Sequence, residues 1–375
     1  ISLSHDNYLS ITGGAQLYLA DEQHLINQQN KSYIHVYPYK KETTLVSSEK
    51  ILYVGVNVDG EPAFETEPNE LVTALTALEN KKLMKLVIHH TMGFNLVTLQ
   101  LFLDFAQRKG TFWLHDYFSL CPSYNLRRND NEYCGAPDIQ SNACQLCKYG
   151  HQRRLQAPEI EQLFRENQLD VAAPSRFSYE LWQSRFPIQS TPHIIPPAAL
   201  KWKNNTPADL TKGILRIGFL GYPLDYKGWQ AWLRLTQELN GNKRYEFFHF
   251  STQSGALGNY TRIDARVTKE NRLAMVESLR QSHIDVAFLW SIVPETFSFT
   301  LHEALAAGCY IVTNPNSGNI QDYIKRHPKR GSILQNETEL FKFLRSDDLV
   351  NSINEYQKYG KPQAELVFGS LEEIE

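Results

Sequence analysis

Residues 284–313, "IDVAFLWSIVPETFSFTLHEALAAGCYIVT", decide the fold. The apolar run 284–290 predicts a buried strand, and 309–313 predicts a second one. Between them, a loop that contains a proline leads into 299–308, which reads as a helix ending at a glycine. Ser298 is a favoured N-cap for that helix. A strand, a loop, a helix and a strand in this order are typical of a Rossmann-like parallel sheet.

The same alternation runs through both halves of the chain, so we predict an α/β protein with two Rossmann-like domains facing a cleft, each a doubly wound parallel sheet. In the first half, strands are expected at 33–37, 51–56, 85–89, 111–115, 170–173 and 193–195, and helices at 69–78, 96–107, 159–167 and 177–185. In the second half, strands are expected at 213–221, 245–251, 284–290 and 309–313, and helices at 228–239, 271–281 and 299–308.

The predicted domains are residues 1–200, with a cysteine-rich loop at 121–151, and residues 208–345. The proline-rich stretch 194–213 is the expected linker. The last segment, 346–375, is expected to pack back on the first domain.

Composition excludes several classes of protein. Thirty-eight Lys and Arg against 41 Asp and Glu give a formal charge of -3, which provides no basic field for nucleic acid. No apolar run approaches the roughly 20 residues that span a bilayer. Five cysteines in 375 residues are too few for a disulfide scaffold and favour the cytoplasm. The chain begins at Ile1 rather than Met, which indicates processing or excision from a longer chain.

The predicted helix start at Phe299, Thr300 and Leu301 is a candidate anion site, because the first N–H groups of a helix have no partner within it. Glu303 lies one turn further along, off the face expected to pack on the sheet, and Glu295 lies on the loop in front. The alternative for any isolated pair of glutamates is one solvated on the helix and one solvated on the loop.

The pattern 294–308, "PETFSFTLHEALAAG", resembles the retaining GT-B-fold glycosyltransferases of the family 4 type, whose signature is Glu, seven residues and Glu. Further segments resemble the same family along nearly the whole chain: "TGGAQ" (12–16), "WLHDYFSLCP" (113–122), "VAAPSRFSYELW" (171–182) and "GFLGYPLDYKGW" (218–229).

The resemblance implies a role for each matching residue. Glu295 would contact the hydroxyls of the donor sugar, and Glu303 would hold the ribose of the nucleotide. The diphosphate would be held by Lys227 and by the helix start at Phe297, Ser298, Phe299 and Thr300. His115 would lie near the donor sugar, and Gly13 and Gly14 would bring backbone N–H groups close to ligand or acceptor. The alternatives are a solvated loop lysine, a structural histidine and an ordinary glycine loop.

One departure from the family concerns the diphosphate. Family members commonly carry an arginine five residues before the lysine, where this chain has Tyr222, and Arg266 or another basic residue would have to substitute. The resemblance implies no catalytic metal, since Lys227 and the helix start stabilise the charge. It also implies a same-face reaction, in which an oxygen of the leaving phosphate takes the proton of the acceptor hydroxyl.

The loop 121–151 holds Cys121, Cys134, Cys144 and Cys147. A C-x-x-C with two further cysteines nearby suits a structural zinc, and a long loop without periodicity needs such a staple or a function. The alternatives are buried unpaired thiols or disulfides. Arg127 and Arg128 within this loop could face the acceptor.

The leading hypothesis is a retaining glycosyltransferase that uses a nucleotide-diphosphate sugar and a glycan or lipid-linked acceptor, in surface polysaccharide or glycoconjugate synthesis. The competing hypotheses are a non-catalytic nucleotide-sugar or glycan-binding module, which Tyr222 keeps open, and a nucleic-acid binder with a zinc loop, against which the charge argues. The expected location is cytoplasmic. A peripheral position at the inner face of the membrane and a place in a multidomain chain are both compatible with the sequence.

Overall fold

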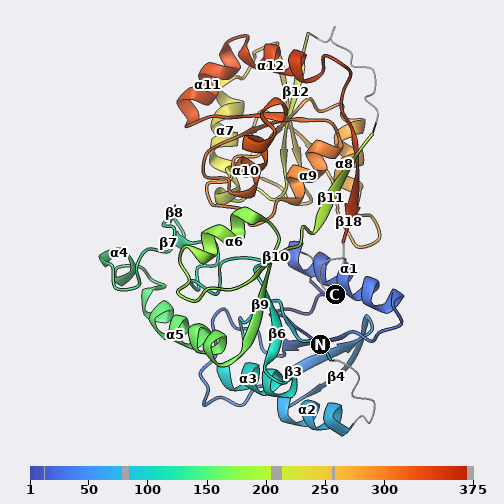
Figure 1. Ribbon diagram of the computed structural model, residues 1–375. Coiled ribbons are helices and arrows are strands. Elements are labelled where there is room, and N and C mark those ends of the chain that lie inside the picture. Colours follow the sequence, from blue (N-terminus) through green and yellow to red (C-terminus); the bar gives the residue numbers. More distant parts are fainter. Residues whose placement is uncertain (12, 78–83, 204–212, 256–257, 370–375) are drawn as a thin grey trace. The chain divides into compact units, whose positions relative to one another are not determined.

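The computed structural model describes residues 1–11, 13–77, 84–203, 213–255 and 258–369 (Figure 1). The chain divides into unit 1, residues 1–197 with 369–375, and unit 2, residues 198–368. Each unit is built on its own β-sheet with helices on both faces, so the predicted class of two Rossmann-like α/β domains is confirmed.

The elements of unit 1 are β1 (Ser2–Leu3), α1 (Gly14–Gln28), β2 (Ile34–Pro38), β3 (Val54–Val58), β4 (Glu61–Thr66), α2 (Pro68–Ala77), β5 (Val87–Ile88), α3 (Leu96–Phe105), β6 (Lys109–Trp113), β7 (Arg127–Arg128), β8 (Glu132–Tyr133), α4 (Asn142–Gln145), α5 (Gly150–Glu166), β9 (Gln168–Ala173), α6 (Arg176–Gln183) and β10 (Pro192–Ile194).

In the described part of unit 1, eight strands form one sheet in the order β10-β9-β6-β5-β1-β2-β3-β4. The prediction of an all-parallel sheet is wrong at one edge, where β2–β3 and β3–β4 pair antiparallel. The loop Asp59–Gly60 joins β3 to β4, and both residues have positive φ. A turn this short can only reverse the chain into a hairpin. Core residues of α2, α3, α5 and α6 pack together on the sheet, and α1 belongs to a separate cluster.

The elements of unit 2 are β11 (Ala198–Trp202), β12 (Leu215–Leu220), the 3₁₀ turn η1 (Asp225–Lys227), α7 (Trp229–Glu238), β13 (Tyr245–Phe250), β14 (Thr261–Ile263), α8 (Ala274–Gln281), β15 (Val286–Phe288), α9 (Phe299–Ala306), β16 (Tyr310–Thr313), α10 (Asn319–Arg326), η2 (Pro328–Arg330), β17 (Gly331–Ile333), α11 (Glu337–Arg345), α12 (Asp348–Tyr356) and β18 (Ala364–Phe368).

Six parallel strands form the described sheet of unit 2, in the order β14-β13-β12-β15-β16-β17. The cores on its two faces come from α7, α11 and α12 on one side and from α8, α9 and α10 on the other (Figure 1). Because β12 and β15 are parallel neighbours, the loops that follow them emerge at the same edge of the sheet.

The expected linker 194–213 contains β11, which pairs antiparallel with β18, while residues 204–212 lie outside the described part. In the segment 346–375, α12 buries Leu349 and Ile353 in the core of unit 2, and β18 buries Leu366 there. Residues 348–368 thus pack in unit 2, Gly369 is grouped with unit 1, and 370–375 are outside the described residues.

Candidate active site

Two loops at the carboxyl edge of the unit 2 sheet are tied to each other. Backbone O of Tyr226, in the turn after β12, accepts from Ile292 N (2.9 Å) and from Ser291 Oγ (3.1 Å), both in the loop after β15. Gly228 is left-handed (φ 88°), and a Cβ there would stand 2.3 Å from Trp290 O. Only glycine allows this approach, which holds Lys227 beside the second loop.

Lys227 and Glu295 form an ion pair across these loops, with Nζ 2.6 Å from Oε1. The Glu295 side chain is 14% exposed and that of Lys227 is 37% exposed. Burial alone would lower the pKa of Lys227, but the Glu295 carboxylate and the Tyr226 hydroxyl outweigh it and raise that pKa above its usual value. The ammonium therefore stays charged at all physiological pH values. Because it is paired with Glu295, Lys227 does not match the alternative of a solvated loop lysine.

The backbone of Glu295 is held by a neighbouring turn that sequence reasoning missed. Asn319 N donates to Glu295 O (2.9 Å), and Ser298 N donates to Asn319 Oδ1 (3.2 Å). A Cβ on Gly318 (φ 65°) would lie 2.6 Å from Glu295 N. The glycine in "NPNSGN" (314–319) was the available signal, because such a stretch marks a turn. The amide of Ser298 is thereby engaged within the protein.

Helix α9 begins as predicted. Ser298 Oγ accepts from Leu301 N (3.1 Å), which is the expected N-cap bond. The helix start faces the loop after β12, since the methyl of Thr300 lies 3.9 Å from the position a Cβ on Gly221 would take. Phe297 stacks on the ring of His302 (centroids 4.4 Å apart) and packs against Phe299.

Glu303 is buried, with 4% of its surface exposed, and so is not a solvated helix residue. Burial raises the pKa of its carboxyl to about 7, against the opposing effect of Arg272. The guanidinium of Arg272 lies 5.6 Å from the centre of the Phe299 ring, so a cation that the sequence did not single out stands at the start of α9. Arg272 lies in a polar stretch of sequence before α8 that matches no motif, so the sequence pattern did not single it out.

In unit 1, His115 was expected to end the strand 111–115, but β6 ends at Trp113 and His115 lies two residues further, with its ring stacked on Trp113 (centroids 4.9 Å apart). Gly13 is the N-cap of α1 and Gly14 its first residue, so the glycine pair opens a helix that the sequence did not predict. A Cβ on Gly13 would meet Gln16 Oε1 at 2.5 Å. Thr12, the first residue of the matched motif, lies outside the described residues.

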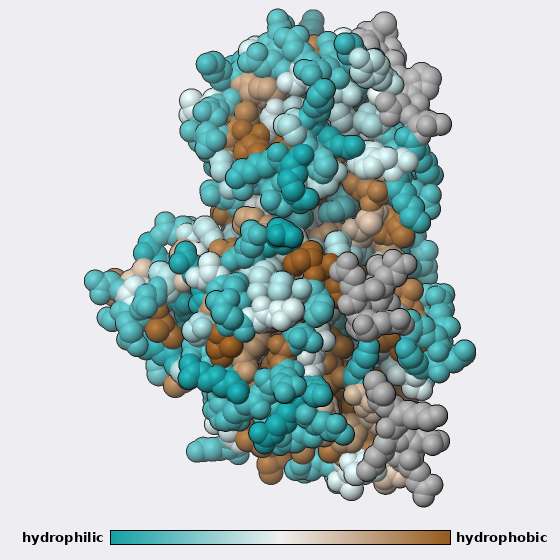
Figure 2. All heavy atoms as spheres, viewed as in Figure 1, coloured by the Kyte–Doolittle hydropathy of each residue, from teal (hydrophilic) through white to brown (hydrophobic). Residues whose placement is uncertain are grey.

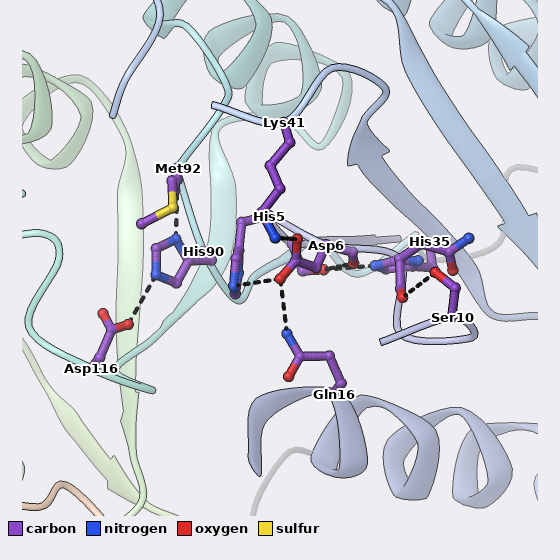
Figure 3. A network of polar contacts seen from close by, with 11 residues as sticks. His5, Asp6, Ser10, Gln16, His35, Lys41, His90, Met92 and Asp116 are labelled. Carbon is purple, nitrogen blue, oxygen red and sulfur yellow. Dashed lines mark hydrogen bonds and ion pairs between the residues drawn. The ribbon is translucent and has the colours of Figure 1, made fainter. Parts of the chain in front are cut away.

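A polar network near the start of α1 was also missed (Figure 3). Asp6 accepts from His5 Nε2 (3.2 Å), Gln16 Nε2 (3.4 Å) and Lys41 Nζ (3.5 Å), and the hydrogen bond from His5 lowers its pKa. His90, 4% exposed in its side chain, pairs with Asp116 at 3.1 Å. The signal was the dipeptides His5-Asp6 and His89-His90, each beginning within two residues of the end of a strand.

The cysteine loop brings Cys121, Cys134, Cys144 and Cys147 to one small cavity, and all four thiols are free, so disulfides are absent there. Arg153 of α5 donates to Cys144 Sγ (2.7 Å) and to the carbonyls of Leu120 and Pro137. Burial raises the pKa of Cys121 to about 12. Among the described residues, no three His, Cys, Asp or Glu side chains are grouped so that they could hold a metal ion.

Arg127 and Arg128 form β7 of this loop. Arg127 donates to backbone O of Asn131, and Arg128 pairs with Glu132, so both guanidinium groups have partners within the β7–β8 hairpin. Cys309, the residue before β16, is fully buried.

The chain resembles solved structures over nearly its whole length, at low sequence identity. Sucrose-phosphate synthase (tll1590) from Thermosynechococcus elongatus gives a TM-score of 0.54 at 9% identity, with 96% of this chain and 94% of that chain covered. Anabaena Alr3699/HepE, in complex with UDP and glucose, gives a TM-score of 0.52 at 12% identity, with 96% and 92% covered. No protein-family model matches the chain, and no curated protein matches it.

These similarities establish the fold, which is the predicted GT-B type with two Rossmann-like domains.

Hydrophilic residues cover most of the face in Figure 2, with hydrophobic residues in separate patches. Within the described ranges, every helix is too short or too polar to cross a bilayer.

Proposed function

We propose that the protein is a retaining glycosyltransferase that moves a sugar from a nucleotide-diphosphate donor to a carbohydrate or lipid-linked acceptor. One observation carries the proposal: the Lys227–Glu295 pair joins two loops at the carboxyl edge of a parallel sheet. The loop with Glu295 leads into α9, and α9 carries the buried Glu303. This edge is where Rossmann-like sheets bind nucleotides, and it combines a cation, a helix start and two carboxylates.

Each group has a task in the proposed reaction. Glu303 accepts hydrogen bonds from the hydroxyls of the ribose, and Glu295 accepts hydrogen bonds from hydroxyls of the donor sugar. Lys227 and the first N–H groups of α9 stabilise the negative charge that grows on the diphosphate as the glycosidic bond breaks. The acceptor hydroxyl attacks the anomeric carbon on the same face from which the diphosphate departs. An oxygen of the leaving phosphate takes the proton of that hydroxyl, so the anomeric configuration is retained.

The fold supports a UDP-sugar as the first donor to test, because the similar HepE structures contain UDP with glucose or UDP-glucose. Thermal unfolding with UDP-, GDP-, ADP- and dTDP-sugars identifies the donor, and release of nucleotide from it measures turnover. We expect stabilisation by one class of donor and slow hydrolysis without acceptor. A donor that binds but is neither hydrolysed nor transferred to any glycan tested would favour the alternative of a non-catalytic binding module. That alternative stays open because an exposed tyrosine, Tyr222, stands where the resembling family commonly has an arginine.

In the cell, this function places the protein in the cytoplasm, where nucleotide sugars are the donors for surface polysaccharide or glycoconjugate synthesis. A lipid-linked acceptor would bring it to the inner face of the membrane.

Binding of the donor is expected to depend on pH through Glu303. A carboxyl with a pKa of about 7 loses its negative charge as the pH falls from 8 to 6, and with it the strong hydrogen bonds to ribose. Affinity for a nucleotide sugar should fall towards about tenfold per pH unit below this pKa. Titration calorimetry with a nucleotide sugar, whose diphosphate does not titrate in this range, measures the effect, and His302, with a pKa of about 4, lies outside it.

Glu303→Gln is the control variant. It should bind the donor more weakly and with no pH dependence between pH 6 and 8. It should also raise the free energy of unfolding at pH 8, by up to about 3 kcal/mol, because the folded carboxyl holds its proton to about pH 7 and the unfolded one only to about 4.5. This gain should vanish at pH 4. Unchanged affinity in Glu303→Gln would remove Glu303 from the nucleotide site.

We also propose that Cys121, Cys134, Cys144 and Cys147 bind a structural zinc ion. The support is that four free thiols line one cavity and that Arg153 Nη1 donates to Cys144 Sγ, an outer hydrogen bond of the kind that metal-bound thiolates accept. Binding requires the sulfurs to turn towards one another and to lose their protons.

Metal analysis tests this directly. Protein purified without chelator should contain about one zinc per chain. Cys144→Ser should lower that content, whereas Cys309→Ser, which removes the buried fifth thiol in unit 2, should leave it unchanged. Replacement by Co²⁺ should give the absorption of tetrahedral thiolate coordination. Metal-free protein with four thiols that react freely in the native state would contradict the proposal.

A further inference from the structure

One face of the antiparallel strands at the edge of the unit 1 sheet carries tyrosines in adjacent positions. Tyr37 of β2 lies opposite Gly55 of β3. Tyr39 N donates to Tyr53 O (2.9 Å), so the pairing of the two strands continues one step beyond their ends. Residues opposite each other across antiparallel strands, and residues two apart along one strand, share a face of the sheet. Tyr37, Tyr39 and Tyr53 therefore lie on the same face.

The ring of Tyr37 is fixed across this face. A Cβ on Gly55 would stand 2.3 Å from Tyr37 Cζ, so the ring covers the glycine, as aromatic rings do when they fill the space of a missing side chain on the neighbouring strand. The Tyr37 hydroxyl accepts from Asn7 Nδ2 (3.1 Å), and the ring stacks on that of His35 (centroids 5.5 Å apart). The ring thus has one defined orientation.

The other two tyrosines are open to solvent. Tyr39 is 59% exposed and Tyr53 is 54% exposed, whereas the opposite face of the same strands buries Val36, Val54 and Val56 in the core. Packing of the core therefore does not account for Tyr39 and Tyr53. Large apolar groups that are exposed together on one surface mark a binding site.

Carboxylates lie beside these rings. Glu65 of β4 is opposite Gly55 and so shares the face of Tyr37, and burial together with this carboxylate raises the pKa of Tyr37 above its usual value. Tyr53 OH donates to Glu67 Oε1 (3.2 Å). A pyranose ring presents C–H groups that stack on tyrosine rings and hydroxyls that donate to carboxylates. Tyrosines and glutamates together suit a ligand rich in hydroxyl groups better than an apolar peptide.

A second copy of this chain is disfavoured as the occupant. Strand β4 forms the edge of the described sheet and carries Glu61, Pro62 and Glu65 at exposed positions. Proline lacks the N–H that a further strand would need, and charged side chains on an edge strand oppose pairing with another chain.

We propose that the surface formed by Tyr37, Tyr39, Tyr53, Glu65 and Glu67, the tyrosine face, binds a neutral glycan. Tyr37 and Tyr39 lie at the carboxyl end of β2, which is parallel to β1, and open α/β sheets bind ligands at this edge. Resting on the proposed function, the ligand is the acceptor, and the tyrosine face holds sugar units of a glycan chain beyond the unit that reacts.

Saturation-transfer NMR and titration calorimetry on the full-length protein test this binding without a donor. The probes are maltohexaose, cellohexaose and chitohexaose, which are neutral oligosaccharides. Irradiation of aromatic protons should saturate the ring C–H protons of at least one probe. Tyr39→Ala and Tyr53→Ala should each weaken its binding about three- to tenfold, the value of one aromatic contact. Failure of all these probes to bind would overturn the proposal.

Control variants separate ring stacking from other effects. Tyr53→Phe keeps the ring and loses the bond to Glu67, so it should retain most of the affinity. Tyr359→Ala removes a tyrosine of unit 2 that is 80% exposed and should leave the affinity unchanged. Unaltered binding in Tyr39→Ala and Tyr53→Ala, or an equal loss in Tyr359→Ala, would contradict the proposal. So would an oligomer that dissociates in Tyr53→Ala during sedimentation, since the occupant would then be a second copy.

Kinetics relates the tyrosine face to the proposed function. Tyr39→Ala should raise KM for a long acceptor and leave both kcat and the KM for a disaccharide acceptor within about twofold, because the ring lies away from the reacting atoms. If glycan binding depends on the tyrosines but no sugar is transferred, the tyrosine face stands and the proposed function fails. If sugar is transferred and KM for long acceptors is the same in the variant, the tyrosine face fails and the proposed function stands.

Discussion

Glutamine in place of Glu295 is expected to reduce sugar transfer by about 10²–10³ in kcat, the loss found when one preorganised polar group is removed from a charged transition state. The substitution keeps the size of the side chain and the backbone bond from Asn319. It removes the carboxylate charge that accepts hydrogen bonds from the donor hydroxyls and that pairs with the Lys227 ammonium at 2.6 Å. Transfer is measured by nucleotide release with the donor found in the thermal screen.

Unit 2 offers a matched control in Glu337→Gln. Glu337 also pairs with a cation at 2.6 Å, the Arg234 guanidinium, but on the exposed face of α7 and α11. Its replacement should leave kcat unchanged and alter the free energy of unfolding by less than about 1 kcal/mol. Turnover at the normal rate in Glu295→Gln, with the thermal unfolding of both variants alike, would exclude Glu295 from the reaction.

Alanine in place of Lys227 should cost about 3–4 kcal/mol of transition-state stabilisation, because charge develops on the leaving diphosphate and this ammonium is already in place. The loss should appear mainly in kcat, since the charge on the phosphate grows during bond cleavage. Lys227→Arg, which keeps the charge, should recover part of the rate. Arg234→Ala serves as the control, because it removes the cation of the exposed pair with Glu337.

The double variant Lys227→Ala/Glu295→Gln sharpens the interpretation. Groups that form one ion pair are coupled, so the combined loss in kcat should be smaller than the sum of the two single losses. A rise in KM alone, with kcat unchanged, would mean that Lys227 only holds the donor. Strictly additive losses would mean that the ion pair has no part in the reaction.

The central strands of unit 2 could be predicted from the sequence because they are apolar on both faces, whereas the shorter strands β14 and β17 were not predicted. The runs at 215–220, 245–250 and 286–288 are enclosed between two layers of helices, and such strands stand out as continuous hydrophobic segments. The start of α9 was predictable for a local reason, since the N-cap bond of Ser298 involves residues three apart.

Unit 1 was harder to predict. Strand β1 has two residues, too few for any periodic pattern, and α1 buries Gln16 and Glu22 on the face where apolar residues are expected. The antiparallel edge depends on the turn Asp59-Gly60, in which both residues have positive φ. An Asp-Gly pair between two strands is a hairpin signal, which the prediction from strand runs overlooked.

In the candidate site, the sequence pattern singled out candidate residues but not their surroundings. The burial of Glu303, which places its pKa near 7, depends on packing by the rest of unit 2. In unit 1, hydrogen bonds join Tyr33 to Glu22, Glu22 to His89 and His89 to His115, which are 11, 67 and 26 residues apart. Contacts of this range follow from topology, and no local spacing encodes them.

The ribbon of β11 and β18 gives the connection between the units an unusual form. Ala198, the first residue of unit 2, pairs with Phe368, the last, and Gly369 N donates to Pro197 O (3.1 Å) just beyond them. Unit 2 therefore begins and ends at residues that lie side by side. If unit 2 is the donor half, as proposed, a sheet of different donor preference could replace it through the two adjacent joints at 197/198 and 368/369.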